Sequence, residues 1–161
     1  MITLARAAER LLILGHVKAR SSLYSTTPVG FADQPRFVNA VVAVETELEP
    51  GPLLNKLLAV EREFGRNRVD EIPNGPRTLD LDILLVDDLE VDTPGLVVPH
   101  PRMSDRAFVL VPLQEIAPQL TVPGKRKTVA ELLKSLQDFR KDETDAVVRM
   151  ESDDWRATTH S

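Results

Sequence analysis

The spacing of apolar residues divides the first third of the chain into a helix and two strands. Apolar side chains recur at helical intervals over residues 3–14, and Gly15 follows as a stop signal. β-branched, aromatic and small residues then dominate residues 17–26 and 37–47, with turn-forming residues between the two runs. The pattern predicts an amphipathic helix followed by two strands that a loop joins.

The rest of the chain is predicted to alternate helices with short strands and loops. Pro52 suits the first turn of a helix, and the leucines after it form an apolar stripe. The predicted segments, in order, are a helix from Pro52 to Gly65, a polar loop at 67–76, a strand at 79–86, a turn at 87–88, a proline-bounded loop at 94–101, helices at 108–116 and 128–139, and a strand at 146–150 within an otherwise charged tail.

This order of elements predicts the α+β class, as a ferredoxin-like βαββαβ sandwich with helices packed on one face of an antiparallel sheet. A chain of 161 residues fits a single domain over residues 1–161, with a polar tail from about residue 141. The opening strand of this order is not found before the first helix. We favour the hypothesis that the native chain starts upstream of Met1. The alternative is that residues 146–150 pair into the sheet as a substitute strand beside residues 79–86.

Composition narrows the class of protein. Apolar residues make up 42% of the chain and charged residues 28%, as in ordinary soluble globular proteins. Charged residues interrupt the segment before the apolar run at 11–14, which argues against a signal peptide, so we expect a cytoplasmic protein that does not bind membranes. The absence of cysteine excludes disulfides, a thiolate nucleophile and a sulfur-ligated zinc site. A formal net charge of −5 argues against non-specific binding to nucleic acid.

The strongest local signal for chemistry is the run from Arg77 to Leu85. Read as a strand, it places Asp80 and Asp82 on one face and the apolar residues on the other. Two carboxylates aimed at one point suit Mg²⁺, which binds a few carboxylates together with substrate phosphates, although a solvated strand face would show the same pair. Nearby guanidinium groups fit phosphate oxygens, although they also fit a solvated helix end and loop. They belong to Arg62, Arg66, Arg68 and Arg77.

Two polar residues stand in surroundings that suggest a ligand. His100 lies between two prolines that fix the backbone, although a lone loop histidine also fits a surface or structural role. Asn39 interrupts an apolar run, and a buried amide must find hydrogen-bond partners. Nearby backbone groups would supply them in a purely structural role. Alternatively, the amide recognises a heterocycle held between the rings of Phe37 and Phe108.

Several motifs occur together in one order along the chain. They are Tyr24-x-Thr26-x-Pro28-x-Gly30, Gln34-Pro35-x-Phe37-x-Asn39, Gly65-Arg66-x-Arg68, Gly75-Pro76-Arg77-Thr78-Leu79-Asp80-Leu81-Asp82, and Pro99-His100-Pro101-x-Met103-x-x-Arg106-x-Phe108-x-Leu110-x-Pro112-Leu113. This ordered set, which covers about residues 19–118, resembles the 6-hydroxymethyl-7,8-dihydropterin pyrophosphokinase family. A chance match to all of these motifs in the same order is improbable.

The resemblance implies an enzyme that moves a pyrophosphoryl group from ATP to the 6-hydroxymethyl oxygen of a reduced pterin, giving AMP and the pterin diphosphate used in folate synthesis. It implies that Asp80 and Asp82 hold two Mg²⁺ ions. The catalytic arginines that meet the phosphates would be Arg66, Arg68 and Arg77, and ATP would also be positioned by Glu61, His100 and Arg106. The pterin would stack on Phe37 and Phe108. Its edge would form hydrogen bonds with Asn39 and would contact backbone groups of Thr26 and Val29.

The sequence also departs from the pattern of that family. Its members ordinarily begin with a strand and a Gly-Ser-Asn loop, neither of which is found here, and Asn74 stands where an aromatic residue often precedes Gly-Pro-Arg. A second hypothesis is therefore a module that binds ATP or pterin with weak or absent turnover. A purely structural protein would not explain the ordered motifs. The sequence leaves the oligomeric state open, and a monomer is our working expectation.

Overall fold

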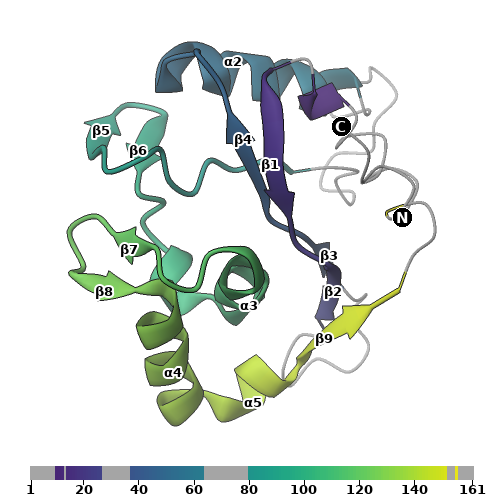
Figure 1. The fold of residues 1–161 in the computed structure, drawn as a ribbon, viewed down its shortest axis with the longest axis vertical. Helices are drawn as coiled ribbons and strands as arrows, with labels where there is room; N and C mark the ends of the chain where they lie inside the picture. The colour runs from purple at the N-terminus through teal and green to yellow at the C-terminus, as the bar shows by residue number, and fades with distance from the viewer. Residues whose placement is uncertain (1–9, 13, 27–36, 64–79, 152–154, 156–161) are drawn as a thin grey trace. The chain divides into compact units, whose positions relative to one another are not determined.

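The computed structural model describes residues 10–12, 14–26, 37–63, 80–151 and 155. Within them the chain is a mixed α+β protein with antiparallel strand pairs and helices, which confirms the predicted fold class (Figure 1). Two compact units are distinguished. The first comprises Met1–Lys18, Val44–Ile83 and Ser152–Ser161, and the second comprises Ala19–Ala43 and Leu84–Glu151. That residues 1–161 form a single domain stays a prediction.

The long helix of the first unit is α2 (Pro50–Glu61). Pro50 occupies its first turn, where a residue without an N–H loses no helical hydrogen bond. The predicted helix is therefore confirmed, with a start slightly before Pro52. Leu57, Val60 and Glu61 are its buried residues beyond the first turn, and their spacing places them on one face of the helix.

A glycine allows two chain segments of the first unit to approach closely. Gly15 directly precedes β1 (His16–Arg20), which pairs with β4 (Val42–Glu45); the boundary between the units passes through both strands. A Cβ atom at Gly15 would collide with the backbone carbonyl of Glu45. Beside it, the hydroxyl of Thr46 donates a hydrogen bond of 2.7 Å to the carbonyl of Leu14. Gly15 therefore has a packing role, whereas the helix predicted at 3–14, which Gly15 is expected to end, lies mostly outside the described residues.

The second unit contains a three-stranded antiparallel sheet in which β2 is central (Figure 1). Its strands are β2 (Leu23–Thr26), β3 (Phe37–Asn39) and β9 (Val147–Met150). Thr26 lies opposite Phe37 on one side and opposite Val147 on the other. The strand predicted at 146–150 is confirmed, but its partner is β2 and not the segment at 79–86.

Each of the two strands predicted for the first third of the chain is interrupted. Between β1 and β2, the hydroxyl of Ser21 accepts the N–H of Val41 at 2.9 Å. The N–H and hydroxyl of Ser22 both donate to the carboxylate of Glu115, each at 2.8 Å. These side chains take the N–H groups of Val41 and Ser22, which a ladder between strands would otherwise use. The predicted strands at 17–26 and 37–47 are therefore each split into two shorter ones.

Residues 80–86 do not form the strand predicted at 79–86. A strand exists as one member of a hydrogen-bonded ladder, and no strand in the described ranges pairs with this segment. Exposure still alternates over residues 80–83, because Asp80 and Asp82 are exposed whereas Leu81 and Ile83 are half-buried, but residues 84–86 are all half-buried. The predicted strand is wrong, but the alternation of polar and apolar positions is observed.

Two predicted helices of the second unit are confirmed as α3 (Ala107–Ile116) and α4 (Val129–Phe139). A reciprocal pair of hydrogen bonds fixes the start of α4. The hydroxyl of Thr128 accepts the N–H of Glu131 at 3.2 Å, and the Glu131 carboxylate accepts the N–H of Thr128 at 2.9 Å. No helix among the described residues has the length and apolar character needed to cross a membrane.

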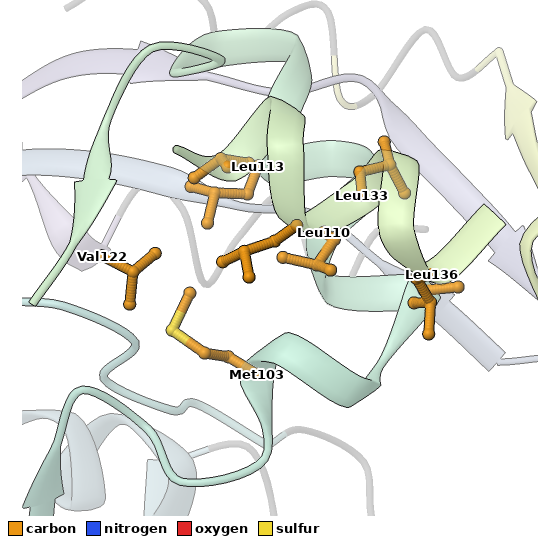
Figure 2. Close-up of a cluster of buried hydrophobic side chains, with 9 residues drawn as sticks. Met103, Leu110, Leu113, Val122, Leu133 and Leu136 are labelled. Carbon is orange, nitrogen blue, oxygen red and sulfur yellow. The ribbon is translucent and has the colours of Figure 1, made fainter. Parts of the chain in front are cut away.

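The hydrophobic core of the second unit gathers around α3 and α4. Met103 comes from the short η2 helix (Met103–Asp105), and Val122 from β7 (Thr121–Val122). Figure 2 shows the side chain of Leu110 in the middle of this cluster. The buried members are Met103, Ala107, Leu110, Leu113, Val122, Val129, Leu132, Leu133 and Leu136. This core fixes α3, the helix that carries Phe108.

Several short elements have no counterpart among the predicted ones. They are the strands β5 (Val91–Thr93), β6 (Leu96–Val98), β7 and β8 (Lys127–Thr128), and the short helix α5 (Lys141–Asp145). The two strand pairs turn at glycines with positive φ, Gly95 at 85° and Gly124 at 82°. β6 lies within the segment predicted as a loop at 94–101, so that prediction is wrong at residues 96–98. The Pro94-Gly95 dipeptide is the turn signal that could have identified the first pair.

Candidate functional site

Asp80 and Asp82 lie exposed in the first unit, with half-buried Leu81 between them. Asp82 has no hydrogen bond or ion pair within the described ranges. The described residues contain no group of three or more His, Asp or Glu side chains that could hold a metal ion. Two exposed carboxylates still fit Mg²⁺, because this ion takes one or two protein carboxylates and fills its octahedron with water and phosphate oxygens.

Glu61 is buried in the last turn of α2, with only 2% of its surface exposed. Its carboxylate accepts a hydrogen bond of 2.6 Å from the N–H of Leu81. The bond therefore joins the end of α2 to the backbone between the two aspartates. The role beside the nucleotide that the resemblance implies for Glu61 stays a prediction.

His100 is held in its loop through both its backbone and its ring. Its N–H donates to the carbonyl of Leu84 at 2.8 Å, and its Nδ1 accepts the N–H of Arg102 at 3.3 Å. The peptide bond that precedes Pro99 is cis. Because Nδ1 is an acceptor, the neutral ring carries its proton on Nε2, which can donate to a phosphate oxygen.

Arg106 and Phe108 face one another at the start of α3. The guanidinium carbon of Arg106 lies 5.6 Å from the centre of the Phe108 ring, within the range of a cation–π contact. Arg106 is the residue that caps α3, and Phe108 lies in the first turn. Both residues are half-buried. The helix and the contact together limit the directions that the Phe108 ring can take.

β2 and β3 bring three of the predicted pterin-binding residues onto adjacent strands. Thr26 is opposite Phe37, and Asn39 is opposite Tyr24. The hydroxyl of Thr26 is buried without a hydrogen-bond partner in the described part of the chain. Such groups are rare in folded proteins, so a polar ligand atom near Thr26 would satisfy it. Asn39 is half-buried, and its side chain has no hydrogen bond within those same ranges.

Several predicted site residues lie outside the described residues. They are Val29, Arg66, Arg68 and Arg77, together with the side chain of Phe37. Their roles stay predictions. The described site residues belong to both units. Glu61, Asp80 and Asp82 are in the first, and Thr26, Asn39, His100, Arg106 and Phe108 are in the second.

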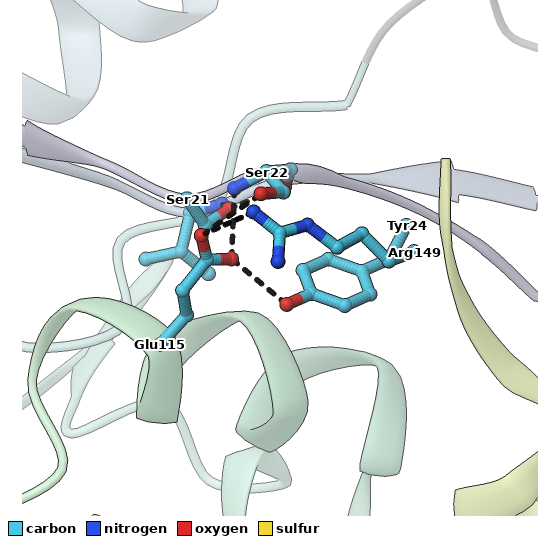
Figure 3. Close-up of polar contacts among 6 residues, drawn as sticks. Ser21, Ser22, Tyr24, Glu115 and Arg149 are labelled. Carbon is cyan, nitrogen blue, oxygen red and sulfur yellow. Dashed lines mark hydrogen bonds and ion pairs between the residues drawn. The ribbon is translucent and has the colours of Figure 1, made fainter. Parts of the chain in front are cut away.

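Sequence reasoning missed a polar cluster in the second unit that is centred on Glu115. Figure 3 shows the carboxylate of Glu115 pointing from α3 toward Ser22 and Tyr24. One carboxylate oxygen accepts from the N–H of Ser22 and the hydroxyl of Tyr24, both at 2.8 Å, and the other accepts from the hydroxyl of Ser22 at 2.8 Å. Arg149 of β9 lies 3.7 Å from the second oxygen. The signal available in the sequence was Glu115 itself, the single acidic residue of the mostly apolar α3.

The cluster around Glu115 changes the acidity of its members. Partial burial opposes ionisation of Glu115, but the hydrogen bonds from Ser22 and Tyr24 and the charge of Arg149 outweigh it and lower its pKa. Burial and the bond to Glu115 raise the pKa of Tyr24 to about 12. Tyr24 therefore stays protonated and donates to an ionised Glu115 at neutral pH. The cluster ties α3, which carries Phe108, to β2, which carries Thr26.

We expect Glu115→Gln to lower the free energy of unfolding by about 1–2 kcal/mol at neutral pH. In this variant an amide nitrogen replaces one carboxylate oxygen and faces a group that donated a hydrogen bond to that oxygen. The folded-state pKa of Glu115 lies below its ordinary value of 4.5, so its contribution is complete above about pH 4.5 and is lost as the pH falls through the folded-state value. Urea unfolding of both proteins at about pH 7 and about pH 3 measures this.

The difference between wild type and Glu115→Gln should shrink at the lower pH, and an equal difference at both values would contradict the assignment. Glu143→Gln is the matched control, since Glu143 forms an exposed ion pair of 3.8 Å with Arg140. Exposed ion pairs contribute little to stability, so we expect little change at either pH.

Comparisons with known proteins agree with the ordered motifs. The model of the 7,8-dihydro-6-hydroxymethylpterin-pyrophosphokinase (HPPK) family matches residues 1–118. Three similar proteins are each named 2-amino-4-hydroxy-6-hydroxymethyldihydropteridine pyrophosphokinase. That of Pseudomonas aeruginosa is 54% identical over 67% of this chain, that of Bacillus subtilis 50% over 62%, and that of Haemophilus influenzae 44% over 78%. The matched regions span 65%, 59% and 76% of the lengths of those relatives, respectively.

Proposed function

This chain belongs to the 7,8-dihydro-6-hydroxymethylpterin-pyrophosphokinase family, and on that premise we propose that it transfers a pyrophosphoryl group from ATP to a reduced pterin. The 6-hydroxymethyl oxygen attacks the β-phosphorus of ATP, and the bond from that phosphorus to the α-phosphate oxygen breaks. The hydroxyl proton is released, and the products are AMP and the pterin diphosphate used in folate synthesis. The reaction takes place in the cytoplasm.

The observation that carries this proposal is the pair of exposed carboxylates at Asp80 and Asp82, within the part of the chain that the family model matches. We propose that they hold two Mg²⁺ ions, which supply charge neutralisation to the phosphates when bound. Phosphoryl-type transfer depends mainly on positioning and on neutralising charge, so it requires no covalent intermediate. The arginines proposed to meet the phosphates are Arg66, Arg68 and Arg77.

Residues of the second unit support binding of both substrates. The proton on Nε2 of His100 suits a donor to a phosphate oxygen of ATP, and Arg106 supplies a second cationic group. The half-buried ring of Phe108 and the amide of Asn39 suit a planar heterocycle with donors and acceptors at its edge. We propose that Phe37 stacks on the opposite face of the pterin, and that Thr26 and Val29 contact its edge.

The products distinguish this reaction from ordinary phosphoryl transfer. We expect the chain to form AMP and pterin diphosphate in equal amounts from ATP, Mg²⁺ and 6-hydroxymethyl-7,8-dihydropterin, measured by separating the nucleotides and by ³¹P NMR. A reaction without pterin is the control for ATP hydrolysis. ADP with a pterin monophosphate would indicate an ordinary kinase. Binding of both ligands in calorimetry without either product would indicate a binding module.

A further inference from the structure

One buried carboxylate anchors the backbone between Asp80 and Asp82. Glu61 is 2% exposed, and its Oε2 accepts the N–H of Leu81 at 2.6 Å. Leu81 is the single residue that separates the two exposed aspartates. A hydrogen bond from a backbone N–H to a carboxylate is shorter and stronger than one between neutral groups. The hydrogen bond therefore holds the backbone at the residue between the two aspartates.

This anchor matters because no strand among the described residues pairs with the segment. In a sheet, ladder bonds on both sides hold a strand and fix the direction of alternate side chains. Residues 80–86 have no strand partner in the ranges that the structure describes. A backbone N–H that is not paired in a ladder still requires an acceptor when it is partly buried. Glu61 provides that acceptor at Leu81, and its own position is fixed by α2.

We propose that Glu61 is a positioning residue for the metal-binding carboxylates. It fixes the backbone at Leu81, so that Asp80 and Asp82 stay exposed together and their oxygens are placed before a metal ion arrives. Outer groups that orient metal ligands contribute substantially to metal affinity. The identity of what the two carboxylates bind rests on the proposed function, whereas the anchor itself rests on the contact between Glu61 and Leu81.

Two substitutions and a matched control test the anchor. Glu61→Gln keeps the side-chain length and one acceptor oxygen, whereas Glu61→Ala removes the acceptor. Glu63→Gln is the control, because Glu63 lies just beyond the same helix end but is exposed and bonds to Arg10 at 2.7 Å. NMR amide exchange measures protection of the Leu81 N–H in the free protein. Titration with Mn²⁺ in the presence of ATP, followed by electron paramagnetic resonance, measures metal affinity.

We expect exchange at Leu81 to accelerate in the order wild type, Glu61→Gln, Glu61→Ala. Mn²⁺ affinity should fall in the same order, by about 10- to 100-fold for the alanine variant. Glu63→Gln should match the wild type in both measurements. The proposal is overturned if both Glu61 variants exchange Leu81 at the wild-type rate, or if their metal affinity equals that of Glu63→Gln.

The glutamine variant keeps the test decisive if Glu61→Ala does not fold, since it retains the volume of the side chain. Failure of the proposed function is recognised separately, because it would appear in the wild-type chain as the absence of AMP formation. Exchange at Leu81 would still follow the same order in that case, since it is measured without substrates.

Discussion

We expect turnover to fall by about 1,000-fold or more when either Asp80 or Asp82 is replaced by Ala, whereas the midpoint of thermal unfolding should change little. A metal ion that neutralises phosphate charge supplies several kcal/mol in the transition state, and each 1.36 kcal/mol corresponds to a factor of ten in rate. Both aspartates are exposed, so their removal opens no cavity in the core. The measurements are AMP formation at saturating ATP and pterin, and thermal unfolding of each variant.

Asp88→Ala is the matched control, because Asp88 is an exposed carboxylate in the turn that follows this segment. Its turnover should equal that of the wild type. If Asp80 and Asp82 serve one metal centre, the double variant is slower by much less than the product of the two single effects. A double variant that loses the full product would contradict a shared centre, and two unaffected single variants would contradict a metal role.

Leu110→Ala should lower the free energy of unfolding by about 2–5 kcal/mol, which is the cost of removing a fully buried leucine and leaving a cavity. Leu110 has no exposed surface and lies in the middle of the cluster in Figure 2. Met103, Leu113 and Leu133 belong to the same cluster and cannot close the space without moving the helices that carry them. Urea unfolding followed by circular dichroism gives the change in free energy.

Phe139→Ala provides the control for side-chain size. Phe139 ends α4 with 87% of its surface exposed, so truncating it removes more atoms than Leu110→Ala but little buried area. We expect a change within about 0.5 kcal/mol. A loss at Phe139 as large as that at Leu110 would mean that burial in this unit does not determine stability. Unchanged stability in Leu110→Ala would contradict the assigned core.

Local sequence signals sufficed where an element is stabilised by neighbours in the chain. The helical spacing over residues 128–139 predicts α4, and the capping pair of Thr128 and Glu131 fixes its start through residues three apart. Proline near the start of α2 was a local signal of the same kind. The strand-like run at 146–150 was also identified, because β-branched residues stand out in a charged tail.

Local signals did not suffice where distant groups compete for the backbone. Nothing near Ser21 and Ser22 in the sequence indicates that Val41 and Glu115 bond to them and interrupt two strands. Alternation over residues 79–86 predicts a strand, but a strand also requires a partner, and periodicity does not supply one. The same limit applies to β9, whose sequence predicts a strand but not the pairing with β2.

The same distinction between local signals and distant contacts applies to the candidate site. The sequence alone determined the family, through motifs whose residue types and order match it, and it predicts Asp80 and Asp82 as metal ligands from their spacing. Only the tertiary structure placed the Glu61 carboxylate on the N–H of Leu81, and joined Glu115 of α3 to Ser22 and Tyr24. The chemical groups of a site are set by the identity of its residues, which can be read directly from the sequence. Hydrogen bonds between residues far apart in the chain form only when packing brings the segments together.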